Sequence, residues 1–425
     1  MIDIIDIQAL EQSGLIHSKT AGRFETVKEL PKEANSFDNI FDYADTFGVI
    51  RLAYINSAHQ ISLKPNKEEK KASAIGGEFG FSTAAYNGIN FHLAAYISQT
   101  INAFNPSQEK INEDFTDVNG DPFMYIGELS LDYTSDFLEL KLGRVKVETP
   151  YANSDDIRMA SNTFQGAWAN LHYTSNFHTQ IFYFNKWAGY DSQDENTLES
   201  QNEFKYLVDD DSLGMMSASL TYEYAKNSEM SVWFNYIDNM ASISYAEIVG
   251  IYFIDKDGFH LDYGLQASYI SELADSGVDG TILGAMAILH YNGLFFGTAI
   301  NGAYSDSGKA VTDGFGGGPY YTSLDEATIG AISEAGAEHI ESKNNAYAYR
   351  IGGGYEFEKM GVYGLVLEGV YGKLSNDHGS ITEKDAIITY EITSRWYLQA
   401  IYTDYQSSQN RNTFDRALVR VDYSF

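Results

Sequence analysis

A short segment in the first half of the chain carries opposed charges just after a proline. Pro150 fixes its own φ and has no amide hydrogen, so strand pairing should stop there. Asp155, Asp156 and Arg158 then follow closely on an irregular segment. If this segment borders an aqueous passage, its charges set a local field that selects which ions pass. In the alternative interpretation it is a solvated surface loop, and its charges only keep it wet.

A second group offers oxygen ligands to a hard cation. Asp117, Asn119 and Asp121 alternate around Gly120, as the ligands of calcium-binding loops do. The segment lacks the glutamate that completes an EF-hand, and an ordinary β-turn explains the same residues. We therefore expect that no cofactor is required, while a bound Ca²⁺ at this loop stays open.

Enzymatic chemistry is not indicated. The nine histidines are scattered, without a Ser/His/acid arrangement or a His-x-x-x-His spacing, and there is no cysteine. No candidate base has an obvious nucleophile beside it. The net charge of −31 repels nucleic acid and favours cations as partners. The sequence predicts a protein that is not an enzyme and does not bind nucleic acid.

The elements that would position these residues alternate apolar and polar side chains. Between Phe259 and Tyr269 every second residue is apolar, which gives a strand one apolar face and one polar face. No apolar run approaches the length of a transmembrane helix, and the mean hydropathy is −0.29. The same pattern predicts about eighteen strands, near 46–56, 73–85, 88–99, 123–134, 137–147, 164–174, 177–187, 213–225, 229–238, 242–254, 258–271, 280–291, 293–304, 344–357, 361–373, 384–393, 395–406 and 414–425.

The predicted connections alternate between tight turns and long loops. The long stretches are 100–122, 148–163, 188–212, 272–279, 305–343, 374–383 and 407–413. The connection at 238–241 is an exception, because it is short where a long loop is expected. Short turns on one rim and long loops on the other are typical of a transmembrane antiparallel up-and-down β-barrel. Soluble β-sandwiches rarely exceed about ten strands in such uniform hairpin order.

The last strand indicates which face meets lipid. Its apolar face ends on Phe425, and a terminal aromatic resembles the closing strand of bacterial outer-membrane barrels, where the insertion machinery reads it. If Phe425 faces lipid, the alternation assigns charged residues of many strands to the lumen. These predicted pore-lining residues are Arg51, Glu78, Glu128, Glu223, Glu247, Asp262, Arg350, Glu356, Glu368, Arg395, Arg416, Arg420 and Asp422.

The signs of these charges are unevenly distributed. The arginines belong to strands on either side of the closing seam, so they could form one basic wall opposite an acidic one and create a transverse field. In the alternative interpretation the lumen charges pair with each other and only solvate the interior.

One segment resembles a known family. Residues 140–166, LKLGRVKVETPYANSDDIRMASNTFQG, resemble the LGR…TP…D.R…TF.G motif of the OprD-like and major outer membrane porins. Residues 315–323, FGGGPYYTS, and 48–51, GVIR, resemble two weaker motifs of that group. The resemblance implies an eighteen-stranded porin with short periplasmic turns and long extracellular loops, often a homotrimer. It also implies that loop 148–163 folds into the lumen and narrows it.

Residues 1–44 are interpreted as a separate extension before a barrel at 45–425. Family members usually begin their barrel sooner, and the extension could plug the lumen, lie in the periplasm or mediate trimer contacts. Met1 is not followed by a signal peptide. We therefore expect either a cytosolic protein or, as the strands favour, a mature outer-membrane chain whose leader has been removed.

Together these patterns predict a passive outer-membrane porin for ions and small hydrophilic solutes that prefers cations. Its partners would be outer-membrane lipid and lipopolysaccharide, whose anionic groups divalent cations could bridge. The alternatives are a substrate-specific channel of the same fold, or a surface adhesin that uses loops 188–212 and 305–343.

Overall fold

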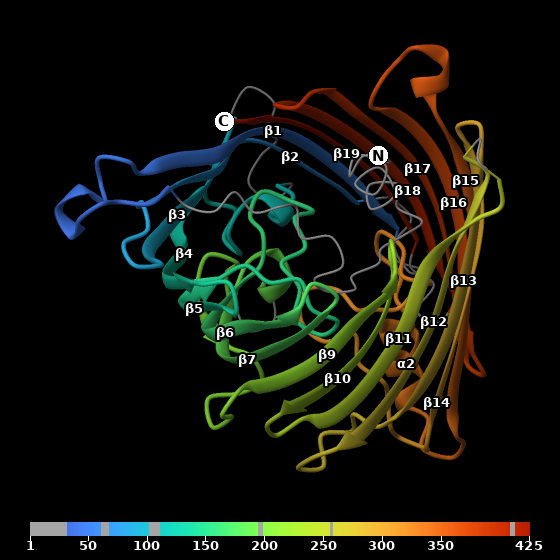
Figure 1. Cartoon of the computed structure of the whole chain (residues 1–425). Helices are drawn as coiled ribbons and strands as arrows, with labels where there is room; N and C mark the ends of the chain where they lie inside the picture. Colours follow the sequence, from blue (N-terminus) through green and yellow to red (C-terminus); the bar gives the residue numbers. More distant parts are fainter. Residues whose placement is uncertain (1–31, 61–67, 102–110, 194–198, 256–257, 409–412) are drawn as a thin grey trace.

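The strands form one antiparallel sheet that closes on itself (Figure 1). The computed structural model describes residues 32–60, 68–101, 111–193, 199–255, 258–408 and 413–425. The first strand, β1, pairs with both β2 and the last strand, β19. One of the nineteen strands, β8, has two residues and pairs only with β7 inside a long loop, so eighteen strands build the wall. The prediction of an eighteen-stranded barrel is confirmed.

The wall follows the chain in meander order. Its strands are β1 (Asp45–Gln60), β2 (Glu68–Ser82), β3 (Ile89–Thr100), β4 (Phe123–Thr134), β5 (Leu138–Val145), β6 (Thr163–Thr174), β7 (Phe177–Ala188), β9 (Met215–Ala225), β10 (Ser228–Ile237), β11 (Ala241–Phe253), β12 (His260–Glu272), β13 (Gly280–Tyr291), β14 (Leu294–Ser305), β15 (Asn344–Glu356), β16 (Leu365–Asn376), β17 (Gly379–Thr393), β18 (Trp396–Ser407) and β19 (Thr413–Ser424). The short β8 is Lys205–Tyr206.

Helical segments are short and lie in the connections. The α-helix α2 (Ile329–Ala337) begins after Thr328, whose hydroxyl caps it by accepting a hydrogen bond from the Ala331 amide. The 3₁₀ turns are η1 (Phe37–Asn39), η3 (Glu113–Phe115), η4 (Tyr190–Ser192) and η5 (Phe357–Met360). Within the described part of the chain, no helix is long and apolar enough to cross a membrane.

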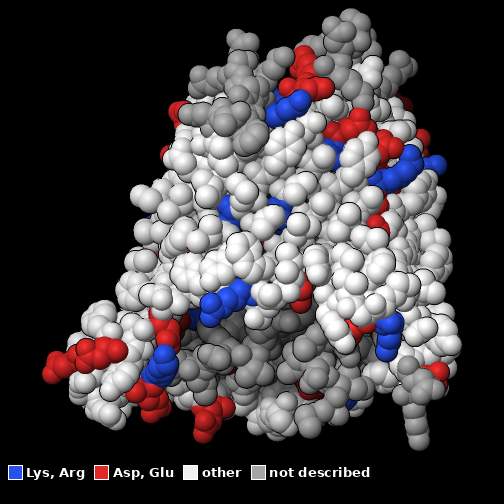
Figure 2. All heavy atoms as spheres, turned by 90° about the horizontal axis from the view of Figure 1, so that it is seen from above, with Lys and Arg blue, Asp and Glu red and all other residues white. Residues whose placement is uncertain are grey.

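Alternation along the strands separates an inner from an outer face. In β12 the residues Asp262 and Gln266 are buried inside the barrel, whereas Leu265 and Tyr269 are exposed outside it. Exposed aromatic side chains such as Tyr291 also lie at the ends of the strands, where a membrane interface favours them. Figure 2 shows one side of the molecule, on which acidic side chains gather toward the two ends and the surface between them is mostly uncharged.

The tight turns use residues that tolerate a left-handed backbone. Asn87 and Gly88 join β2 to β3 with φ of 53° and 80°, and Asn292 and Gly293 join β13 to β14 with φ of 54° and 84°. Positive φ at both central residues gives a turn whose twist matches that of the paired strands. At the rim that carries these short turns, few residues therefore extend beyond the ends of the strands.

The connection between β16 and β17 differs from its prediction. The prediction of a long loop at 374–383 was wrong: the two strands stay paired from Asn376 opposite Gly379, so only two residues connect them. The polar residues there belong to the ends of the two strands. Because strand ends that extend into water carry polar residues, their composition resembles that of a loop.

The predicted extension before the barrel is described only in part. Residues 1–31 lie outside the described residues. Residues 32–44 lie against the β2–β3 turn, where the Ala34 amide donates to the Ala85 carbonyl at 2.8 Å.

Candidate functional site: a charged network inside the barrel

The loop between β5 and β6, residues 146–162, crosses the barrel interior. The buried Tyr151 hydroxyl hydrogen-bonds to Ser268 of β12 at 2.6 Å and to the Tyr320 hydroxyl at 2.7 Å. On the other side Asp156 contacts Arg51 of β1. Because β12 and β1 are well separated around the ring of strands (Figure 1), these contacts stretch the loop across the lumen. We call residues 146–162 the first inward loop.

Arg51 joins this loop to the seam of the barrel. Its Nη1 and Nη2 donate to the two carboxylate oxygens of Asp156 at 2.7 and 2.8 Å, and its Nε and Nη2 donate to Asp422 of β19 at 2.8 and 2.7 Å. Nη1 also donates to the Arg158 carbonyl at 2.5 Å. The planar guanidinium suits this bidentate pairing on two sides. Burial alone would raise the pKa of Asp156, but the nearby Arg51 charge outweighs it and holds that pKa well below its usual range.

A second cluster of ion pairs lies beside the first. Arg158, which is 1% exposed, donates to Asp114 at 2.9 Å and to Glu326 at 3.3 Å. Arg416 of β19 pairs with both Asp325 and Glu326. Burial by itself would raise the pKa of Asp325, but Arg416 and Arg158 lower it to about 2. The segment that carries Asp114, the first inward loop and the segment that carries Asp325 and Glu326 therefore meet the wall in one charged network.

A second inward loop, residues 306–343 between β14 and β15, supplies Asp325 and Glu326. It reaches the wall at several points: the Gln266 side chain donates to the Pro319 carbonyl at 2.9 Å, and Arg350 donates to the Ser323 carbonyl at 2.6 Å. The backbone amides of Glu326 and Ala327 donate to the Glu383 carboxylate at 3.0 and 2.8 Å. Much of this loop is thus buried in the barrel, while its two ends, near residues 306–307 and 338–341, are exposed.

The two inward loops are paired through their backbones. The Asn153 amide donates to the Phe315 carbonyl at 2.9 Å, and the Phe315 amide donates to the Tyr151 carbonyl at 3.0 Å. A Cβ on Gly316 would lie 2.0 Å from the Asn153 carbonyl oxygen, so only glycine permits this approach. The Gly-rich motif seen in the sequence is the place where the loops touch.

Replacing Gly316 by alanine should separate the inward loops. The change adds both the strain of a φ of +81° and a clash with the first loop, and we expect a loss of thermal stability and a larger or noisier single-channel conductance. Gly361→Ala is the matched control, because Gly361 also has a positive φ, +84°, but a Cβ added there would meet no other atom within 4 Å. Equal effects of both variants would contradict a role for the close approach.

A cavity of about 240 Å³ lies between the inward loops and the wall. Its lining includes Asp156, Arg158, Arg350, Asp385 and Arg420. The Nε atoms of Arg350 and Arg420 are buried and make no hydrogen bond to the described residues. Arg420 is held by donation from Nη1 to the Asp156 carbonyl at 2.5 Å. The site thus brings acids and arginines to one cavity, and two buried arginine Nε atoms there have no hydrogen-bond partner among the described residues.

The structure places the predicted site residues unequally. Asp156 and Arg158 lie in the network, and Asp155 precedes it with a φ of 26°. Glu223 and Glu356 have inward parity but sit near the short-turn rim, where Glu223 is exposed. The residues on the inner face of the wall are Arg51, Glu78, Glu128, Glu247, Asp262, Arg350, Glu368, Arg416, Arg420 and Asp422.

Two expectations about arginines need correction. Arg395 does not line the lumen: it lies in the turn between β17 and β18, is exposed, and donates to the Tyr423 hydroxyl at 3.4 Å on the outer face. The alternation of inward and outward side chains holds only within a strand, and Arg395 lies beyond the end of β17. The idea of one basic wall is also incomplete, because Arg51 and Arg416 face carboxylates. Sequence reasoning missed the acids Asp114, Asp325 and Glu326, which nothing in their spacing singles out.

The predicted calcium loop forms a turn. The Asp117 carboxylate accepts hydrogen bonds from the amides of Asn119 and Asp121, both at 2.8 Å. This is the turn alternative for the same residues. Calcium binding here stays a prediction, and a thermal stability that falls with chelator and returns with Ca²⁺ would support it.

Comparison with known proteins identifies the family. Residues 135–394 match the family model described as outer membrane porin, OprD family. The fold is similar to Pseudomonas aeruginosa OpdK, solved with vanillate (TM-score 0.73, 16% identity, 91% of this chain and 99% of that chain), and to a BenF-like porin from Pseudomonas fluorescens Pf-5 (TM-score 0.76, 15% identity, the same coverage). A search of curated proteins finds no match. With its family model matched over more than half its length and its barrel shared, the chain belongs to the OprD family of outer membrane porins.

Proposed function

We propose that this chain is a passive channel through which ions and small hydrophilic solutes cross the outer membrane, with the first inward loop as its constriction. The observation that carries the proposal is the network of Arg51, Asp156, Arg158 and Arg416. It fixes a charged loop across the lumen next to a small polar cavity. Charged side chains at the narrowest point of an aqueous path decide which solutes pass.

Cations are the preferred ions in this proposal. Acids outnumber arginines on the inner wall: the inward-facing acids include Glu128, Asp132, Glu247, Asp262 and Asp422, and the inward-facing arginines are Arg51, Arg350, Arg416 and Arg420. The chain as a whole carries a net charge of −31. An excess of fixed negative charge concentrates cations in the lumen.

Planar bilayers under a KCl gradient test the preference directly. We expect a reversal potential of the sign that K⁺ selectivity produces, and an anion-selective potential would refute the argument from the acidic lumen. Swelling of proteoliposomes in small sugars tests passive diffusion separately. A folded barrel that admits no solute would overturn the channel proposal.

A substrate-specific channel is the second candidate, and the free guanidinium donors favour it. Arg350 and Arg420 both line the cavity with an Nε that has no hydrogen-bond partner among the described residues. A solute carboxylate could accept from both groups. Vanillate, present with OpdK, is an aromatic carboxylate of this class.

Replacing Arg420 by glutamine should separate the two candidates. We expect K⁺ selectivity to rise and the uptake of an aromatic carboxylate, measured in proteoliposomes, to fall several-fold, because one donor and one positive charge leave the cavity. Lys384→Gln is the control, since Lys384 points outward and pairs with Asp404 at 2.8 Å. If carboxylate uptake is unchanged while ion selectivity shifts, the pore is a general porin.

Assembly as a homotrimer is also proposed, on the strength of the family resemblance. Chemical cross-linking in native outer membranes should give a species of three chains. A single-chain species alone would contradict it.

A further inference from the structure

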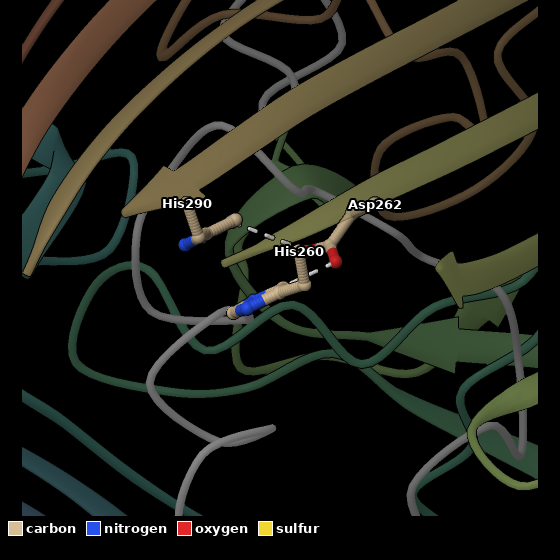
Figure 3. Close-up of side chains that lie close together, drawn as sticks. All are labelled: His260, Asp262 and His290. Atoms are coloured by element: carbon tan, nitrogen blue, oxygen red, sulfur yellow. Dashed lines mark ion pairs between the residues drawn. The ribbon is translucent and has the colours of Figure 1, made fainter. Parts of the chain in front are cut away.

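Two histidines and an aspartate form a compact cluster on the inner face of the barrel, away from the constriction (Figure 3). His260 and Asp262 belong to the start of β12, and His290 to the end of β13, close to the short-turn rim. His260 is directly opposite His290 in the strand register, and Asp262 is the next inward residue after His260. Residues thirty positions apart thus meet through cross-strand pairing.

The two histidine nitrogens lie close to the Asp262 carboxylate, each nearest to a different oxygen. The His290 Nε2 lies 3.3 Å from Asp262 Oδ2, and the His260 Nε2 lies 3.9 Å from Asp262 Oδ1. All three ligand atoms are within 4.8 Å of one another. Around a tetrahedral ion with bonds of about 2.0–2.1 Å, neighbouring ligand atoms stand about 3.3 Å apart. The cluster needs only a small side-chain movement to close on such an ion.

The tautomer of His260 is set for ligation. Its Nδ1 lies 2.7 Å from the Gly258 carbonyl oxygen, which can only accept, so Nδ1 carries the proton. With Nδ1 committed to the carbonyl, Nε2 is the ring nitrogen that faces Asp262. A hydrogen bond from the other ring nitrogen to a carbonyl is the usual outer support of a metal-binding histidine.

The cluster also contains unsatisfied buried groups. Asp262 is 3% exposed and His290 is 6% exposed. Neither Asp262 carboxylate oxygen nor His290 Nε2 makes a hydrogen bond to any described residue. A carboxylate in such a position is costly unless a charge or a hydrogen-bond donor compensates it. Protonated histidines would pair with Asp262, whereas neutral histidines leave it uncompensated, and a bound cation would then satisfy all of these atoms at once.

Aromatic rings hold the histidines in place. His260 and His290 are stacked with ring centroids 4.4 Å apart, and they are flanked by Phe253 at 5.7 Å and by Phe295 at 5.9 Å. The four rings come from the consecutive strands β11 to β14. This row restricts the rotamers of both imidazoles, so less freedom is lost when a ligand binds.

We propose that His260, Asp262 and His290 bind a divalent transition-metal ion with the ligand preference of Zn²⁺. Two imidazole nitrogens and one carboxylate oxygen suit zinc and exclude Ca²⁺ or Mg²⁺, which take oxygen ligands. Three protein ligands leave at least one position for water or for a group of a passing solute. The inference does not depend on the proposed solute selectivity, because it concerns a site on another part of the wall.

Calorimetric titration of the full-length, EDTA-treated barrel in detergent with ZnCl₂ tests the site. We expect one high-affinity ion per chain, and Co²⁺ in its place should give a visible absorption spectrum of a site with nitrogen and oxygen ligands. Asp262→Asn and His290→Gln should each weaken Zn²⁺ binding at least tenfold. Slower gel migration after heating checks that each variant is a folded barrel.

A variant of another stacked pair controls for adventitious binding. His339 and His378 also stack, with centroids 3.6 Å apart, but belong to no cluster of three metal-binding side chains among the described residues. His378→Gln should leave the high-affinity site intact. The proposal is overturned if the unmodified barrel shows no such site, if His378→Gln abolishes it, or if both Asp262→Asn and His290→Gln bind Zn²⁺ as tightly as the unmodified barrel does.

Discussion

Replacing Arg51 by methionine is expected to destabilise the barrel by about 3 kcal/mol and to raise its single-channel conductance. Breaking a buried ion pair by removing one partner costs about 3–5 kcal/mol, and the partly exposed Asp156 side chain puts this case near the lower end. Asp422 would stay buried beside a methionine, and the first inward loop would lose its bidentate anchor. Thermal unfolding and bilayer recordings of the same preparation measure both effects.

Asp156→Asn separates the contribution of the Arg51–Asp156 pair, which holds the first inward loop, from that of the Arg51–Asp422 pair, which joins β1 to β19. It removes the charge from the loop but leaves the Arg51–Asp422 pair intact, so the conductance should change while most of the stability remains. Arg51→Lys keeps the charge but cannot donate to both carboxylates in two pairs of hydrogen bonds. If Arg51→Met left both thermal stability and conductance unchanged, the network would not hold the loop.

Replacing Arg416 by methionine should have a comparable effect that depends on pH. In the unmodified protein the pKa of Asp325 is lowered to about 2, so this carboxylate contributes stability that is fully present above its ordinary pKa of 3.8 and is lost as pH falls through about 2. Without Arg416, burial becomes the dominant influence and the pKa rises. The loss at pH 7 should be about 3 kcal/mol, and it should shrink as the solution is acidified toward pH 4.

A double variant tests the origin of that pH dependence. Arg416→Met combined with Asp325→Asn removes the unpaired charge, so the double variant should be more stable at pH 7 than Arg416→Met alone. Its stability should also depend less on pH in the acidic range. A loss for Arg416→Met that is the same at pH 4 and pH 7 would contradict the electrostatic explanation and point to lost packing.

The wall was predictable because each strand carries its own signal. The alternation from Phe259 to Tyr269 exists only if one face meets an apolar environment and the other meets water, and β12 shows this alternation. The same reasoning gave a wrong prediction for residues 374–383. Asn376, Asp377 and Gly379 have the composition of a turn, and the strands around them continue past the apolar zone into water.

The sequence predicted where the first inward loop begins and ends, but it did not predict which residues its charged side chains contact. Pro150 and the family motif located the first inward loop, yet the partners of its charges come from residues far away in the chain. Arg51 and Asp156 are 105 positions apart, and Arg158 and Glu326 are 168 apart. The alternation of apolar and polar residues along a strand carries no information about contacts between residues so far apart in the chain. The His260, Asp262 and His290 cluster was missed for a related reason, because ligands on two strands depend on the register between them.

The Arg51 contacts have a consequence for the order of assembly. Arg51 lies in the first strand and Asp422 in the last, 371 positions later, so their ion pair cannot form until the two ends of the wall have met. The same guanidinium anchors Asp156. Sealing of the cylinder and docking of the first inward loop are therefore coupled at one residue. A half-inserted chain lacks this anchor, and the first inward loop becomes fixed across the interior in the step that makes the wall continuous.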